Sequence, residues 1–392
     1  MEHYRRTWTE IDLDKIKRNL QCIRSLLDPG TAIMGIIKAD AYGHGAIPVA
    51  SELKDDVAMF AVSGLDEAVQ LRKGGISNDI LILGYTPADS TDELIRLGIT
   101  QTVFSYEYAR KLYTQACKLD KELKVHIKID TGMSRLGFAA QTCSDALQSE
   151  DEILQIISQF GRALHVEGIF THFAVSDEPE DTFTAMQFER FTGVCKALQD
   201  RGIRLKYRHC CNSGAIIDFP HMQLDMVRPG IILYGMQPAK GLRDIGLSPA
   251  LSLKTVVAQT HRLKKGMSIS YGRTYTAQSD MTVATIPIGY ADGYPRALSN
   301  IGQVLVNGRR ANIVGRICMD QCVIDISDIP NVHEGSIVTV IGRDGKETIT
   351  AEEIADKLGS INYEITCLIG KRVPRVYFKN NTEVDSRCYI TD

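Results

Sequence analysis

An α/β fold, in which an N-terminal TIM (β/α)8 barrel precedes a mostly β C-terminal domain, is predicted by three features of the sequence. Over the first 240 residues, short runs rich in valine, isoleucine and leucine alternate with amphipathic stretches, as in parallel βα units. Eight such runs occur, and a TIM barrel usually takes about 250 residues. After residue 240 the helical periodicity fades. The length of 392 residues suits two or three domains.

The runs predicted as barrel strands are residues 33–37, 59–62, 80–83, 101–104, 125–129, 166–170, 207–211 and 231–234. Helices are predicted over residues 65–72, which Gly74 and Gly75 terminate, and over residues 105–112, which Ser105 caps. A doubly wound open sheet is the structural alternative. That fold usually has fewer strands and a glycine-rich phosphate loop after the first one, and no such loop follows residues 33–37.

The C-terminal part predicts a β domain with one helix. Its strands are expected at residues 255–258, 281–286, 304–306 and 336–341. Turn signals lie at Asn307-Gly308 and Asp344-Gly345, and a helix is expected over residues 351–358. The predicted organisation is therefore a barrel over residues 1–240, a β domain over residues 241–380, and a loose polar tail over residues 381–392.

Charge and cysteine usage narrow the function classes. Lysine and arginine total 45 against 48 acidic residues, which gives no electrostatic case for nucleic acid or an anionic membrane surface. The apolar runs are too short to span a bilayer, and the N-terminus lacks the apolar stretch of a signal peptide. Ten scattered cysteines without zinc-type spacing predict a reducing cytoplasm and no metal site.

Catalytic groups in TIM barrels lie at the C-terminal ends of the strands. That rule selects Lys38 and Tyr42, Asp130 and Arg135, His172 and Ser213, and Arg228 and Gly230 join them from the segment just ahead of the predicted eighth strand. Such a cationic barrel mouth, with few carboxylates, suits a small molecule that carries phosphate and carboxylate groups. The paired carboxylates of glycosidases and the ligand cluster of two-metal hydrolases are not evident. A single Asp-Thr-Gly sequence excludes an aspartic protease, which needs two.

Each candidate also has a simpler structural explanation. Lys38 alone could be a solvated strand end, His172 a core histidine, and Arg135 half of a weak surface ion pair. The constellation at the strand ends is less easily dismissed than any single member.

Residues 37–45 read IKADAYGHG. This segment closely resembles the lysine motif of the bacterial alanine racemases, which depend on pyridoxal phosphate (PLP). Further matching motifs are DTGMSRLG at 130–137, GIFTHF at 168–173, NS at 212–213, MVRPGI at 226–231, SYGRTY at 270–275, IGYADG at 288–293, GRICMDQ at 315–321 and INYE at 361–364. The resemblance covers about residues 7 to 378, and it implies a PLP-binding barrel followed by a β domain.

The resemblance also implies the catalytic roles. Lys38 would hold PLP and act as the base on the D-alanine side. Tyr271 would be the base on the L-alanine side, since two bases on opposite faces suit racemisation. Tyr271 and Met319 would be contributed across a homodimer interface. The family places Arg228 against the pyridine nitrogen, where an arginine stays protonated up to a pH above about 12. His172 is expected between Arg228 and Tyr271.

Binding roles follow from the same resemblance. Arg135 and the Met319 backbone would bind the substrate carboxylate. The phosphate would be held by Tyr42, Ser213, Gly230, Ile231 and Tyr363. Several family members carry a carbamylated lysine at the position of Lys128, where it positions the arginine that matches Arg135. The same modification is predicted here.

Other functions remain as alternatives. Serine racemases share these motifs, but the bulky Tyr363 favours alanine over a substrate with a hydroxymethyl group. A PLP barrel decarboxylase would need an acidic group in place of Arg228 and a cysteine in place of Tyr271. A single-domain PLP carrier would lack the β domain, and a decayed regulator would not retain Lys38. The expected role is D-alanine supply for peptidoglycan, while breakdown of D-alanine remains open.

Overall fold

The computed structural model describes residues 6–178 and 180–391, and the chain divides into two compact units. The barrel unit consists of Lys17–Ala41 and Ala46–Leu247. The β unit consists of the N-terminal segment that ends at Ile16, the short segment Tyr42–Gly45, and the chain from Ser248 onward. Each unit is therefore assembled from segments that are distant in sequence.

The barrel unit contains a closed sheet of eight parallel strands. Each strand pairs with the next along the barrel, and the last pairs back with the first. In order round the barrel they are β2 (Ala32–Ile36), β3 (Met59–Val62), β4 (Asp79–Ile82), β5 (Ile99–Val103), β6 (Leu123–Asp130), β8 (Leu164–Phe170), β9 (Tyr207–His209) and β10 (Met226–Val227). These results confirm the predicted (β/α)8 barrel.

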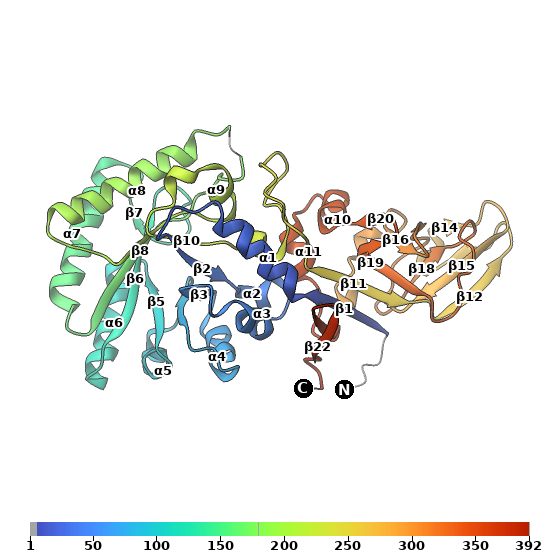
Figure 1. The fold of residues 1–392 in the computed structure, drawn as a ribbon, viewed down its shortest axis with the longest axis horizontal. Helices are drawn as coiled ribbons and strands as arrows, with labels where there is room; N and C mark the ends of the chain where they lie inside the picture. Colours follow the sequence, from blue (N-terminus) through green and yellow to red (C-terminus); the bar gives the residue numbers. More distant parts are fainter. Residues whose placement is uncertain (1–5, 179, 392) are drawn as a thin grey trace. The chain divides into compact units, whose positions relative to one another are not determined.

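Helices surround the barrel strands, as Figure 1 shows for α4 to α8. The helices of this region are α1 (Leu13–Arg24), α2 (Lys38–Tyr42), α3 (Ala46–Leu53), α4 (Leu65–Lys73), α5 (Thr91–Arg96), α6 (Tyr106–Leu119), α7 (Cys143–Phe160), α8 (Phe183–Asp200) and α9 (Ser213–Asp218). The Ser105 hydroxyl accepts the Tyr108 N–H at 3.2 Å and caps α6, as the sequence predicts. A further short strand, β7 (Phe138–Ala139), pairs with β6.

The eighth barrel strand is not the one that the sequence predicts. The apolar run Ile231–Tyr234 forms a 3-10 helix, and β10 takes the place of the strand. All four residues of that run are buried, so they show no polar alternation that would separate a strand from a helical turn. As a result, Arg228 directly follows the eighth strand rather than preceding it.

The β unit is built on three sheets. The largest has the order β17-β16-β19-β11-β1-β21-β22, with β20 paired to β19, and the others are β12-β15-β18 and β13-β14. Their bounds are β1 (Thr7–Asp12), β11 (Leu251–Val256), β12 (Gln259–Leu263), β13 (Ser268–Ile269), β14 (Tyr275–Thr276), β15 (Met281–Ile286), β16 (Gln303–Val306), β17 (Arg309–Asn312), β18 (Cys322–Asp325), β19 (Ile337–Asp344), β20 (Glu347–Ile349), β21 (Arg375–Lys379) and β22 (Thr382–Arg387). Two helices complete the unit, α10 (Ala351–Leu358), as predicted, and α11 (Asn362–Cys367).

Two features of the β unit differ from the predicted organisation. Thr7–Asp12, which the prediction includes in the barrel region without assigning a strand, form β1, and this strand pairs with β11 and β21 and so belongs to the β unit. Strand β22 occupies half of the segment predicted as a loose tail and pairs antiparallel with β21. Its residues are largely exposed because β22 is an edge strand, and this polarity conceals the strand in the sequence.

Within the described residues, no helix is both long enough and apolar enough to cross a membrane.

Candidate active site

Five candidate side chains of the barrel unit follow five different strands. Lys38 begins α2 after β2, Arg135 follows β6, and His172 follows β8. Ser213 begins α9 after β9, and Arg228 follows β10. Because the strands are parallel, their C-terminal ends lie at one end of the barrel. The fold therefore brings these candidates to the same mouth.

Arg228 is buried and held by groups from two other strand ends. Its Nη2 donates to the carbonyl oxygens of Thr171 at 2.7 Å and Cys210 at 3.0 Å, and it lies 3.3 Å from His172 Nδ1. Its Nη1 lies 2.9 Å from His209 Nδ1. Burial lowers the Arg228 pKa to about 10, below the value expected from sequence, but the guanidinium stays protonated at neutral pH. Among the described residues, nothing accepts a hydrogen bond from its Nε.

Two buried histidines extend this network, and sequence reasoning missed both. A guanidinium only donates, so His209 Nδ1 accepts and its proton lies on Nε2. His209 Nε2 in turn donates to His126 Nδ1 at 2.9 Å. His126 packs so closely on Gly168 that a Cβ there would lie 2.7 Å from the ring. His126 precedes Lys128 by two positions, and that same-face spacing is the signal that could have identified it.

Charge and burial keep these histidines neutral. Burial, followed by the charge of nearby cations, lowers the pKa of His126 to about 3 and holds the pKa of His209 well below its usual value. The His172 pKa is also well below its usual value, because of burial and then the charges of Arg228 and Lys128. Neutral His172 can accept from Arg228 at Nδ1 and carry a proton on Nε2.

Lys128 lies on β6 with its ammonium nitrogen 5.0 Å from the centre of the Phe170 ring. Its side chain is buried. Burial first, and then the charges of Arg228 and Arg135, lower the Lys128 pKa to about 7. A large fraction of this amine is therefore neutral and nucleophilic near neutral pH.

The loop that carries Arg135 is organised by Asp130, the last residue of β6. The Asp130 Oδ1 accepts the N–H groups of Gly132 and Ser134, each at 3.0 Å. The Ala140 N–H donates to the Asp130 carbonyl at 2.9 Å, so both ends of the loop are joined at Asp130. Arg135 itself is exposed and retains a long, adaptable side chain.

Ser213 supports the segment that follows Arg228. Its hydroxyl oxygen accepts the Gly230 N–H at 2.9 Å, which joins the end of β9 to the end of β10. The preceding Asn212 caps α9 by accepting the Ala215 N–H at 3.1 Å. The structure thus brings Ser213, Gly230 and Ile231 together.

The turn after Lys38 has an unusual backbone. Ala39, Asp40, Ala41 and Tyr42 all have φ between 51° and 55°, which makes α2 a left-handed turn. Left-handed helix costs roughly 1–2 kcal/mol per residue for L-amino acids, so tertiary contacts must hold the turn. One such contact is the Asp40 carboxylate, which accepts the Ala46 N–H at 2.8 Å.

Tyr42 and Tyr363 lie together in the β unit. Their ring centres are 6.0 Å apart with the planes tilted by 53°. The Tyr42 side chain is buried, and burial together with Tyr363 raises the Tyr42 pKa. Tyr42 therefore keeps its proton and can act as a hydrogen-bond donor.

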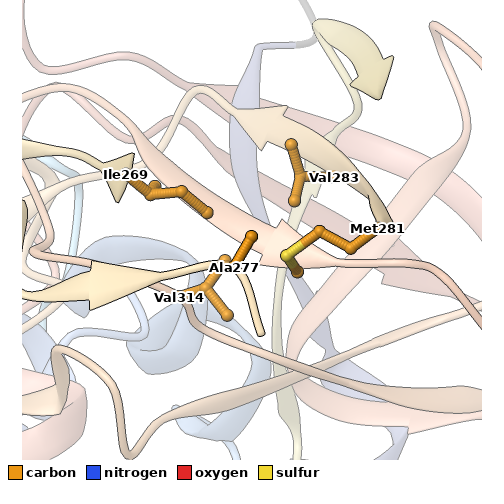
Figure 2. Packing of buried hydrophobic residues seen from close by; sticks show 5 residues of the cluster. All are labelled: Ile269, Ala277, Met281, Val283 and Val314. Atoms are coloured by element: carbon orange, nitrogen blue, oxygen red, sulfur yellow. The ribbon is translucent and has the colours of Figure 1, made fainter. Parts of the chain in front are cut away.

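Tyr271 and Met319 are exposed in the β unit, with relative exposures of 70% and 53%. Tyr271 begins the 3-10 helix Tyr271–Arg273, and Ile269, two residues earlier, is anchored in a hydrophobic cluster with Ala277, Met281, Val283 and Val314 (Figure 2). The backbone before Tyr271 is thus fixed while its side chain is not.

The Met319 segment rests on a buried carboxylate. Asp292 accepts hydrogen bonds from Arg6 and from Arg372, whose Nη2 reaches Asp320 at 2.6 Å. The Met319 carbonyl accepts the Ala291 N–H at 3.0 Å, and a Cβ at Gly289 would collide with that carbonyl. Within the described residues, the Met319 N–H has no acceptor and is available to a ligand.

Family models and relatives match almost the whole chain. Models described as the alanine racemase N-terminal and C-terminal domains match residues 11–238 and 250–377. The alanine racemase of Clostridium tetani is 44% identical, over 99% of this chain and all of its own. The alanine racemase of Desulfovibrio desulfuricans is 47% identical, over 95% of this chain and 98% of its own.

A solved structure has the same fold. The structure of alanine racemase from Clostridium difficile 630 superposes with a TM-score of 0.93 at 40% identity, over 99% of this chain and 100% of its own.

Proposed function

The chain belongs to the alanine racemase family and catalyses the interconversion of L-alanine and D-alanine, and from that premise we propose how its residues do so. It uses PLP, with two bases on opposite faces of the substrate, in a homodimer with shared active sites. The observation that carries this proposal is the buried, protonated side chain of Arg228. No described residue accepts a hydrogen bond from its Nε, so this N–H can donate to a ligand. A buried donor of this kind fits an aromatic nitrogen that accepts.

The described residues fit PLP in both units. In the barrel unit, Lys38 would hold the cofactor covalently, while Ser213, Gly230 and Ile231 would hold its phosphate. In the β unit, Tyr42 and Tyr363 would serve the phosphate as hydroxyl donors, in agreement with the raised Tyr42 pKa. When bound, PLP supplies an electron sink for the charge that is left when the Cα proton departs.

The two proposed bases act at one carbon from opposite faces. In the L-to-D direction, Tyr271 Oη takes the Cα proton and Lys38 Nζ returns one to the other face. In the reverse direction the two residues exchange roles. One base cannot easily reach both faces, which is why two are needed. His172, neutral and in contact with Arg228, would be the neighbour of Tyr271 in this network.

Arg228 tunes the reaction. Its pKa of about 10 keeps it protonated at neutral pH, so it would donate a hydrogen bond to the pyridine nitrogen and leave that nitrogen without a proton of its own. PLP held in this way would be a weaker electron sink, which would favour prompt return of the Cα proton over side reactions such as transamination.

Substrate recognition is assigned to Arg135 and the Met319 backbone, which would bind the carboxylate. The Met319 N–H fits this role because it has no acceptor within the described part of the chain. Tyr363 favours alanine over serine, since its ring packs against the Tyr42 ring and leaves less room for a hydroxymethyl group.

The homodimer supplies Tyr271 and Met319 of one chain to the Lys38 of the other. Their exposures of 70% and 53% support this arrangement, because a catalytic base needs surroundings that exclude water. Mixing inactive Lys38→Ala chains with inactive Tyr271→Phe chains tests it. A mixed dimer would contain one intact site, so random reassociation should restore about a quarter of wild-type activity. No recovery would contradict a shared site.

We also propose that Lys128 is carbamylated. Its neutral amine would attack CO₂ and release a proton, which leaves a carbamate anion near the cationic Arg135 and Arg228. The anion would orient Arg135 toward the substrate carboxylate. Intact-mass measurement under CO₂ should detect the modification, and an unmodified Lys128 in active enzyme would contradict it.

The decisive experiment follows D-alanine formation from L-alanine, and D-serine formation from L-serine, by the purified holoenzyme. We expect turnover of alanine well above that of serine. A higher kcat/KM with serine would make the chain a serine racemase, and no turnover of either despite PLP-type absorbance would exclude racemase function. A cytoplasmic enzyme that supplies D-alanine for peptidoglycan is the cellular role we propose, and the scattered cysteines support the reducing location.

A further inference from the structure

The carboxylate of Glu67 connects the ends of two neighbouring barrel strands beside Lys38. Its Oε1 accepts the Ala39 N–H at 2.6 Å. Its Oε2 accepts the Ser63 N–H at 2.7 Å and the Ser63 hydroxyl at 3.0 Å. Ser63 directly follows β3, and Ala39 directly follows Lys38. One side chain therefore fastens the residue after Lys38 to the end of the next strand.

The position of Glu67 in α4 explains its reach. Gly64 is the N-cap of α4, so Glu67 is the third helical residue. A glutamate there usually turns back to the N-cap N–H and satisfies it. Here the carboxylate extends one residue further back, to Ser63, and sideways to Ala39. Helix capping alone would not require the contact with Ala39.

Ala39 is the first residue of the left-handed turn, and Glu67 supplies a hydrogen-bond acceptor for its N–H. Its N–H belongs to the start of a helical turn, where backbone donors have no partner within the helix. A separate contact, from the Ala46 N–H to the Asp40 carboxylate, joins the turn to the start of α3. Glu67 thus holds the beginning of the strained segment, and Asp40 links that segment to the next helix.

We propose that Glu67 is a positioning residue for Lys38. By fixing the Ala39 N–H and the Ser63 backbone, it sets the direction in which Lys38 leaves β2. The link to catalysis rests on the proposed function, in which Lys38 binds PLP and moves the substrate proton. The link to the backbone of the turn does not depend on it.

Three variants of the full chain separate positioning from helix capping. Glu67→Ala removes both contacts. Glu67→Gln keeps the shape, but its single acceptor oxygen can serve only Ala39 or Ser63. Asp66→Asn is the matched control. Asp66 is exposed, lies in the same helix turn and has no contact with Ala39, so this substitution removes one charge without changing the turn.

Hydrogen exchange of the apoprotein is the first measurement. In Glu67→Ala, the peptide that covers residues 38–46 should exchange roughly 10- to 100-fold faster, since a charge-assisted hydrogen bond is lost. Glu67→Gln should give a smaller increase, and Asp66→Asn none. A role confined to capping would accelerate exchange in residues 64–73 while residues 38–46 stay unchanged, and that outcome would overturn the proposal.

The holoenzyme gives the second measurement. Glu67→Ala should lower kcat roughly 10-fold or more with KM for alanine little changed, and should shift the pH profile of the Lys38-bound cofactor absorbance. Wild-type kcat and an unchanged absorbance profile in Glu67→Ala would overturn the positioning role. If wild-type protein racemises neither amino acid, the proposed function fails, whereas the exchange experiment still tests the tie between Glu67 and the turn.

Discussion

Arg228 in the barrel unit and Tyr271 in the β unit are the extremes of exposure among the proposed catalytic residues. Arg228 is buried and contacts Thr171, His209 and Cys210 of its own unit. Tyr271 is 70% exposed, although the backbone before it is anchored through Ile269 and the backbone after it is anchored by the pairing of β14 with β13.

This difference separates catalytic residues that are already buried within one chain from a catalytic residue that a partner chain must shield from water. Burial within the barrel unit already shifts the pKa values of Arg228, Lys128 and His172. Tyr271 is exposed, so its own chain does not exclude water from the phenol. The barrel unit should therefore hold the covalent link to the cofactor and tune its ring, while the β-unit base should act only when a partner chain covers it.

The largest effect is expected from Lys38→Ala. Without the amine, the covalent link to PLP and one of the two bases are lost, so racemisation should fall at least about 1,000-fold. The absorbance of Lys38-bound PLP should disappear from the visible spectrum. Lys73→Ala, which removes an exposed lysine at the end of α4, should leave both properties unchanged. Retained absorbance in Lys38→Ala would assign the PLP lysine elsewhere.

Tyr271→Phe should separate binding from catalysis. It should keep the PLP absorbance, because the proposed cofactor lysine lies in the barrel unit, but lose roughly 100- to 10,000-fold in racemisation. Removal of the Cα proton from L-alanine, followed by solvent deuterium exchange, should be affected more than removal from D-alanine. Tyr85→Phe alters another exposed tyrosine and should leave both the PLP absorbance and the rate of racemisation unchanged. Equal loss from both enantiomers would contradict the assignment of Tyr271 to one face.

Arg228→Lys should test how much the buried contacts of Arg228 contribute to stability and catalysis. Lysine keeps the charge but cannot reproduce the planar contacts to His209, Thr171 and Cys210. We expect a loss of roughly 1–3 kcal/mol in the free energy of unfolding, measured by denaturant titration. We also expect kcat/KM to fall about 10- to 100-fold. Arg208→Lys, at the ion pair with Asp225, is the control and should affect stability but not catalysis.

The smallest effect is expected from the titration of Lys128. Below its pKa of about 7 the amine is protonated and cannot attack CO₂, and above it the amine is neutral. At constant dissolved CO₂, carbamate at Lys128 should therefore increase from pH 6 to pH 8, as measured by ¹³C NMR. Lys128→Met should raise the KM for alanine a few-fold and abolish that signal. A carbamate signal that does not change with pH would contradict the lowered pKa.

Local sequence alone determined much of this fold. Short runs, most of them rich in apolar residues, identified seven of the eight barrel strands, because strands buried on both faces carry mainly apolar side chains. Ser105, Gly74 and the helix over residues 351–358 followed from capping and periodicity. Ordered motifs identified the family, since each keeps residue types in fixed spacing around one chemistry.

Tertiary structure decided what depends on residues far apart in the chain. The pairing of β1 with β11 and β21 joins the N-terminus to the C-terminal sheet, and no local pattern encodes a partner strand. The helical form of Ile231–Tyr234 was likewise not readable from the sequence, because complete burial of the run removes the polar alternation that marks a strand.

The second layer of the site has the same origin. His126, His209 and Arg228 come from three strands, and Glu67 reaches Ala39 across 28 positions of sequence. Their contacts exist because the parallel sheet places the ends of neighbouring strands side by side. The sequence therefore determined which groups carry the chemistry, whereas the closed barrel decided which neighbours hold them, because hydrogen bonds depend on distance in space and not on distance along the chain.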